Sequence, residues 1–68
     1  MKALKVSLKH IISANNIIED NRILDNNLYQ TASNYWIITG ADNLVIQEIT
    51  HYFGAFKVPF VIEEIEGA

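Results

Sequence analysis

Two segments of this chain have the composition of β-strands but carry apolar side chains on both of their faces. They are residues 35–39, which read Tyr-Trp-Ile-Ile-Thr, and residues 58–65. Successive side chains of a strand point to opposite faces of the sheet, so each segment presents apolar groups on either side. A chain of 68 residues has little material with which to cover two faces. We therefore expect that one packed helix leaves part of the sheet unshielded.

Length and composition indicate a single compact domain spanning residues 1–68. The chain has no cysteine, which excludes disulfides and thiolate metal sites. Its hydrophobic fraction of 50% with 19% charged residues is too apolar for a disordered chain, and no apolar run approaches the roughly 18 residues of a membrane span. Lys2, Lys5 and Lys9 interrupt the first residues, so we expect neither a secretory signal nor a cleavage site. A cytoplasmic location and the absence of any cofactor are the resulting expectations.

The charges are few and unevenly distributed. A formal net charge of -3 argues against a sequence-independent nucleic-acid binder, which needs a basic surplus. Three of the five cations lie within the first ten residues, and three glutamates lie within the last six. If the two terminal strands are neighbours, each opposite-charge pair across them contributes roughly 0.2 to 1 kcal/mol. The cations are Lys2, Lys5 and Lys9, and the glutamates are Glu63, Glu64 and Glu66.

Residues 3–12 have the alternation of a strand with one buried face. Leu4, Val6 and Leu8 alternate with lysines and a serine, which is the period of two expected for a strand. The alternative is a basic amphipathic helix, because Leu4, Leu8 and Ile12 also fall at helical spacing. Such a helix would suit a membrane-surface protein.

Residues 13–34 contain six asparagines and allow two interpretations. In the first, asparagine-containing turns separate short strands at residues 22–24 and 28–32. In the second, Asn16 caps a helix, with Glu19 three residues later and a buried stripe through Ile17 and Leu28. We favour the strands, because each asparagine lowers the helix propensity of the segment.

The second half of the chain is easier to interpret. Residues 35–39 predict a central strand, and Asp42 or Asn43 predicts the start of a helix that runs to about Phe53, with Gly54 as its left-handed stop. Pro59 lacks a backbone donor, so the final strand is expected at a sheet edge or paired only beyond the proline. The predicted fold is α+β, with a small antiparallel or mixed sheet of three to five strands and one helix, about residues 43–53, packed on one face. The alternative is a β-α-β-α-β order with a second helix at about residues 17–32.

No set of residues in the sequence has the pattern of a catalytic, metal or phosphate site. His10 and His51 lack the partners that a metal or acid–base site requires, so a structural role is favoured for both. Residues 39–42 join a strand to a helix, but one glycine followed by Asp42 is typical of an ordinary capped turn. We therefore expect a protein that is not an enzyme.

The two-sided apolar strands instead predict a surface for another protein. The hypothesis is a non-enzymatic interaction module, a small regulator or inhibitor that forms a homodimer or binds a different protein partner. Small size and frequent asparagine are compatible with a phage or mobile-element protein. The alternative is nucleic-acid binding through Lys2, Lys5, Lys9 and Arg22 with nearby aromatic rings. The predicted interface residues are Tyr35 or Trp36, Phe56 and Phe60 as anchors, with Glu63 and Glu64 in an acidic rim.

Overall fold

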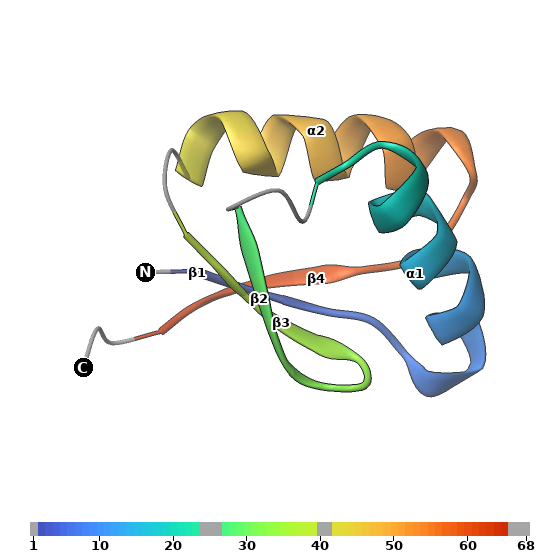
Figure 1. Cartoon of the computed structure of the whole chain (residues 1–68), viewed down its shortest axis with the longest axis horizontal. Coiled ribbons are helices and arrows are strands. Elements are labelled where there is room, and N and C mark those ends of the chain that lie inside the picture. Colours follow the sequence, from blue (N-terminus) through green and yellow to red (C-terminus); the bar gives the residue numbers. More distant parts are fainter. Residues whose placement is uncertain (1, 24–26, 40–41, 66–68) are drawn as a thin grey trace.

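The chain folds into one antiparallel four-stranded sheet covered on one side by two helices (Figure 1). The computed structural model describes residues 2–23, 27–39 and 42–65, and of Asp42 only the backbone. The strands lie in the order β2-β3-β1-β4, and the sequence of elements is that of the β-α-β-β-α-β ferredoxin-like motif. The elements are β1 (Lys2–Lys5), the 3-10 helix η1 (Leu8–His10), α1 (Ile11–Asp20), β2 (Leu28–Ala32), β3 (Tyr35–Ile38), α2 (Asp42–Ala55) and β4 (Val61–Glu64).

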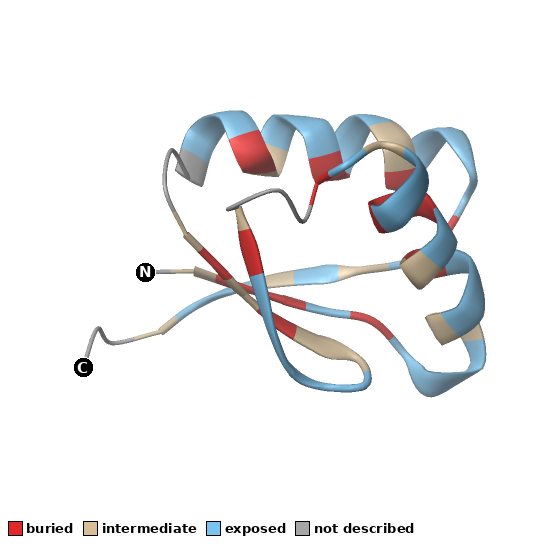
Figure 2. Cartoon of the chain, viewed as in Figure 1, coloured by how far each residue is buried: buried red, intermediate tan, exposed pale blue. Residues whose placement is uncertain are grey.

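The core lies between the two helices and one face of the sheet. Among the described residues, each helix contributes three buried side chains to it, and the largest buried side chain is Trp36 of β3. Figure 2 marks the buried positions along both helices and the sheet. Helix α1 contributes Ala14, Ile17 and Ile18, a spacing that places them on one side of the helix. Helix α2 contributes Val45, Ile49 and Phe53 in the same way.

The predicted α+β class, antiparallel sheet and helix near residues 43–53 are confirmed. The strands at residues 28–32 and 35–38 are present, and β4 is an edge strand whose pairing begins after Pro59. The second helix predicted as an alternative exists, but it occupies residues 11–20 rather than 17–32. Predictions that concern Leu24, Gly40 and Glu66 lie outside the described residues.

The strand predicted over residues 3–12 is wrong beyond Lys5. The chain leaves the sheet after β1 and enters η1 and then α1, so His10 precedes a helix instead of ending a strand. Two apolar side chains that suggested a longer buried face are in fact solvent-exposed, Leu8 at 65% and Ile12 at 76%. Residues 21–23 form the turn that follows α1, so the strand predicted at residues 22–24 is also wrong for its described residues.

Helix α1 ends in a Schellman motif with an arginine at the left-handed position. The backbone N–H of Ile23 donates to the carbonyl of Ile18 at 3.1 Å, and that of Arg22 donates to Glu19 at 3.2 Å. Arg22 has φ of 56°, which glycine adopts more cheaply. Ile23 is fully buried, and this supplies the hydrophobic contact that accompanies the motif.

Helix α2 ends in the same way, which corrects the prediction for Gly54. The N–H of Val58 donates to Phe53 at 2.9 Å and that of Lys57 donates to Gly54 at 3.1 Å. The left-handed residue is Lys57, with φ of 57°. Gly54 lies one residue before the last residue of the helix, Ala55, and does not stop it.

The two edge strands differ in what they offer to another chain. The N–H of Thr39 donates to the carbonyl of Asn27, and that of Val6 donates to Asn34. Since hydrogen-bonded and non-bonded pairs alternate along antiparallel strands, the backbone groups of Leu28 and Gln30 point out of the β2 edge. The same alternation leaves the backbone of two β4 residues pointing outward. Strand β4 carries Glu63 and Glu64, whereas β2 has no charged residue.

Candidate functional site: the open face of the sheet

Both helices lie on the same side of the sheet, so its other side has no covering layer among the described residues (Figure 1). Strand β3 shows the division most clearly. Trp36 and Ile38 point toward the helices and are 0% and 1% exposed, whereas the intervening Ile37 is half-buried and lies outside the core cluster. The sequence left open whether Tyr35 and Ile37 or Trp36 and Ile38 face away from the helix. The structure places Tyr35 and Ile37 on the uncovered side.

We call this uncovered surface the open face. Paired residues of neighbouring strands point to the same side of a sheet, so the register defines its two rows. The first row runs from Tyr29 through Ile37 and Ala3 to Glu63, and the second runs from Ala32 through Tyr35 and Lys5 to Val61.

The centre of the open face is apolar and closely packed. Ala3 is 0% exposed although no helix lies over it, because Ile37 and Glu63 flank it on the neighbouring strands. Toward the two edges, Tyr29 is 67% exposed and Val61 is 55% exposed. Large apolar groups at both margins with a small residue between them make a continuous surface of the kind that marks interaction sites.

The open face also carries one cation and one anion that have no partner within the described structure. Lys5 stands opposite Tyr35 and Val61, and Glu63 stands opposite Ala3, so neither charge meets the other in register. No ion pair or hydrogen bond to the side chain of either residue is found among the described residues.

The helix-covered side shows the opposite arrangement. Lys2 and Glu64 are register partners on β1 and β4, and their side chains form an ion pair. The ammonium group of Lys2, through its hydrogen bond and its charge, lowers the pKa of the Glu64 carboxyl from its ordinary value of 4.5. The terminal strands β1 and β4 are therefore neighbours, and of the terminal charges expected to face each other, Lys2 and Glu64 form a pair among the described residues.

The predicted aromatic anchors lie in four different environments. Tyr35 is on the open face, whereas Trp36 is fully buried in the core, where its indole Nε1 has no hydrogen-bond partner among the described residues. Phe60 is half-buried and packs edge-to-face on Phe53, with ring centroids 5.6 Å apart. Phe56, at the end of α2, is 64% exposed and lies on the helix side of the molecule. Of these four, only Tyr35 contributes to the open face.

The four cations proposed for nucleic-acid binding do not share one surface. Lys2 and Lys5 point to opposite faces of β1, and Lys2 is paired with Glu64. Lys9 and Arg22 lie beyond opposite ends of α1. Nucleic-acid binding through these side chains stays a prediction.

The histidines occupy ordinary structural positions. His51 is exposed on α2 and contacts the Tyr52 ring edge-to-face at 5.0 Å, and His10 is half-buried where η1 meets α1. Within the described ranges there is no group of three or more histidine or acidic side chains that could hold a metal ion. No described helix is both long and apolar enough to cross a membrane.

Sequence reasoning missed two of the most exposed members of the open face as site residues, Tyr29 and Val61. The alternation within residues 28–32 was a usable signal, since a buried Leu28 places Tyr29 on the other side. Comparison with known proteins finds no matching family model, no similar curated protein and no similar solved structure.

Proposed function

We propose that this chain is a non-enzymatic protein-interaction module that associates with a second copy of itself through the open face. The observation that carries the proposal is the pair of unmatched charges, Lys5 and Glu63, set in an apolar surface that neither helix covers. A charge that no described residue of its own chain neutralises is available to a partner.

The two charges are complementary across a two-fold axis. In a symmetric face-to-face pair, the same patch of each copy meets its own counterpart. A two-fold axis that lies in the interface between Lys5 and Glu63 brings Lys5 of each copy opposite Glu63 of the other. Two reciprocal ion pairs would then lie on either side of the axis, over β1 and β4, and opposite charges at such positions fix the register of the two copies.

The size of the face supports a weak association. Four strands about 4.8 Å apart and about four residues long give a sheet footprint of roughly 260 Å² per copy. A pair of such faces buries less than the roughly 1,200 Å² of a standard stable interface. We therefore expect a dissociation constant on the order of micromolar to millimolar, suited to a reversible regulator rather than to an obligate dimer.

Sedimentation velocity from about 10 μM to about 1 mM tests the proposal, since this range brackets the expected dissociation constant. The sedimentation coefficient of the native chain should rise with concentration toward that of a dimer. A coefficient that stays at the monomer value throughout would overturn the proposal.

Charge reversal tests which surface is used. Lys5→Glu and Glu63→Lys should each weaken association, because each places like charges opposite one another. An equimolar mixture of the two variants, or the double variant, should restore it. Lys9→Glu is the matched control, because this exposed cation lies on η1, away from the open face. Association that is indifferent to Lys5→Glu and Glu63→Lys would place the interface elsewhere.

A further inference from the structure

A second concave surface lies on the helix side of the molecule, away from the open face. It is a groove of about 460 Å³ between α1 and the C-terminal end of α2, a volume within the range of small-ligand sites. It is lined by Ser13, Asn16, Ile17, Asp20, Asn21, Tyr52, Phe56 and Val58.

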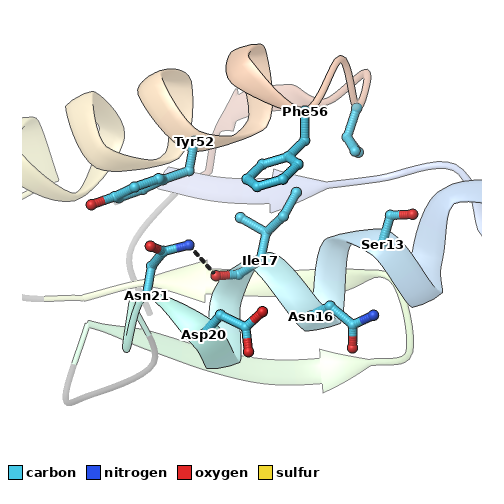
Figure 3. Close-up of a pocket in the computed structure, with 8 residues that line it drawn as sticks. Ser13, Asn16, Ile17, Asp20, Asn21, Tyr52 and Phe56 are labelled. Atoms are coloured by element: carbon cyan, nitrogen blue, oxygen red, sulfur yellow. Dashed lines mark hydrogen bonds between the residues drawn. The ribbon is translucent and has the colours of Figure 1, made fainter.

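One wall of the groove is aromatic. Tyr52 and Phe56 extend from α2 toward α1, with Ile17 of α1 beneath Phe56 (Figure 3). Ile17 and Val58 are almost fully buried, at 4% and 6% exposed, and form the apolar base of the groove. Phe56 remains 64% exposed although it is a large apolar ring. The groove therefore offers the largely exposed ring of Phe56 beside the half-buried ring of Tyr52.

The opposite wall belongs to α1 and is polar. Asn21 is already engaged, because its Nδ2 donates to the carbonyl of Ile17 at 2.9 Å. The carboxylate of Asp20 is exposed and forms no ion pair or hydrogen bond among the described residues. Arg22 and Lys57 follow the two helices closely, yet neither is paired with it. The last turn of α1 has no basic residue, so Asp20 adds its charge to the negative end of the helix dipole.

From these two walls we infer that the groove binds a small organic ammonium compound that carries an aromatic or other apolar group. Aromatic ring faces attract cations, and a carboxylate beside them supplies the matching charge. The apolar group of the ligand would lie over Ile17 and against Phe56 or Tyr52. Its ammonium group would lie between the Phe56 ring and Asp20 and contact both, so that Asp20 gains a partner not found among the described residues.

Three indole compounds of matched size test the inference: tryptamine, the alcohol tryptophol and indole-3-propionate. Each is titrated into the ¹⁵N-labelled native chain near pH 7 and followed by two-dimensional NMR. Tryptamine should shift the amides of residues 16–21 and 52–58 and bind about three- to tenfold more tightly than tryptophol. Indole-3-propionate should bind most weakly.

Two variants identify the residues responsible. Asp20→Asn should reduce the affinity for tryptamine to that for tryptophol, whereas Glu19→Gln, the matched change at the exposed neighbour outside the groove lining, should leave it unchanged. Phe56→Leu, which keeps an apolar side chain without a ring, should also lower the preference for the amine. Equal affinities for the amine and the alcohol, an Asp20→Asn variant that binds like the native chain, or shifts confined to the open face would each overturn the inference. Because the groove and the open face are separate, Lys5→Glu should not alter these titrations, and failure of either proposal can be told from failure of the other.

Discussion

Strands β1 and β4 carry one lysine–glutamate set on each side of the sheet, and the two sets behave differently. On the helix-covered side, Lys2 and Glu64 are register partners and form an ion pair within the chain. On the open face, Lys5 and Glu63 are displaced from one another along the strands and stay unmatched. The same two residue types therefore neutralise each other on one side and remain available to another molecule on the other side.

The difference depends on register and not on composition. Residues directly opposite on paired strands have their Cβ atoms about 4.5–5.5 Å apart, whereas diagonal positions such as those of Lys5 and Glu63 are about 7–8 Å apart. Lys2 lies opposite Glu64, but Lys5 lies opposite Val61, and its ammonium group forms no ion pair with a described residue. Charges on a sheet should thus be interpreted together with the pairing of their strands.

The largest expected effect is a loss of stability on truncating an isoleucine of β3, and it differs between the two sides of the sheet because Ile38 faces the helices and Ile37 lies on the open face. Ile38→Ala should lower the free energy of unfolding by about 2 to 5 kcal/mol, because the side chain is 1% exposed and leaves a cavity beneath the helices. Ile37→Ala should lower it by about 1 kcal/mol or less, since Ile37 is only half-buried. Urea denaturation at low protein concentration, where association does not contribute, measures both values. Equal losses would mean that the open face is packed as tightly as the core.

A smaller change in stability is expected from a substitution in α2, one of the two helices that cover the sheet. Gly54→Ala should raise the free energy of unfolding by about 0.5 to 1 kcal/mol, because Gly54 is inside α2 and an added Cβ meets no atom within 4 Å. Thermal or urea unfolding measures the change. Ala55→Gly, one residue further along the same helix, should have the opposite sign and similar size. Destabilisation by Gly54→Ala would instead indicate the left-handed role that the sequence suggested.

The smallest effect is the pH dependence of the Lys2–Glu64 pair. Lys2 lowers the pKa of Glu64 in the folded chain. At pH values between this lowered pKa and 4.5, the unfolded chain therefore binds more protons than the folded chain. The stabilisation is therefore complete above about pH 4.5 and is lost as pH falls through the folded pKa. Urea midpoints between about pH 7 and pH 3 should show the native chain and Lys2→Met converging at low pH. Lys9→Met, which removes an unpaired exposed cation, should show no such convergence, and parallel curves for the native chain and Lys2→Met would contradict the prediction.

Much of the sheet could be predicted from the sequence, whereas the first helix was predicted only as an alternative and with the wrong bounds. Strands β2 and β3 have aromatic or β-branched residues bounded by turn residues, which is a local signal. Helix α1 has no side-chain cap, and two asparagines at its centre reduce its propensity, so the burial of Ile17 and Ile18 against the core is what stabilises it. That burial depends on tertiary contacts that no window of the sequence contains.

The candidate sites divide in the same way. Alternation within β3 means that either Tyr35 and Ile37 or Trp36 and Ile38 face away from the helices. The position of the helices shows that the pair on the open face is Tyr35 and Ile37. The groove was not predicted, because it joins Asp20 at the end of α1 to Phe56 just beyond α2, and the sequence favoured strands over a helix in the region of α1. Phe56 was chosen as an anchor for its type alone, and its placement beside a carboxylate emerged only from the fold.

The uncharged β2 edge has a consequence for how copies of this molecule could align laterally. A copy that approaches side by side meets the outward amides of Leu28 and Gln30 without electrostatic repulsion, whereas the glutamates of β4 repel a similar approach. The bulge between Gln30 and Ala32 leaves only a short regular stretch of backbone for such alignment. A pair of chains joined along β2 would rest on a few amide contacts and would fall apart on dilution.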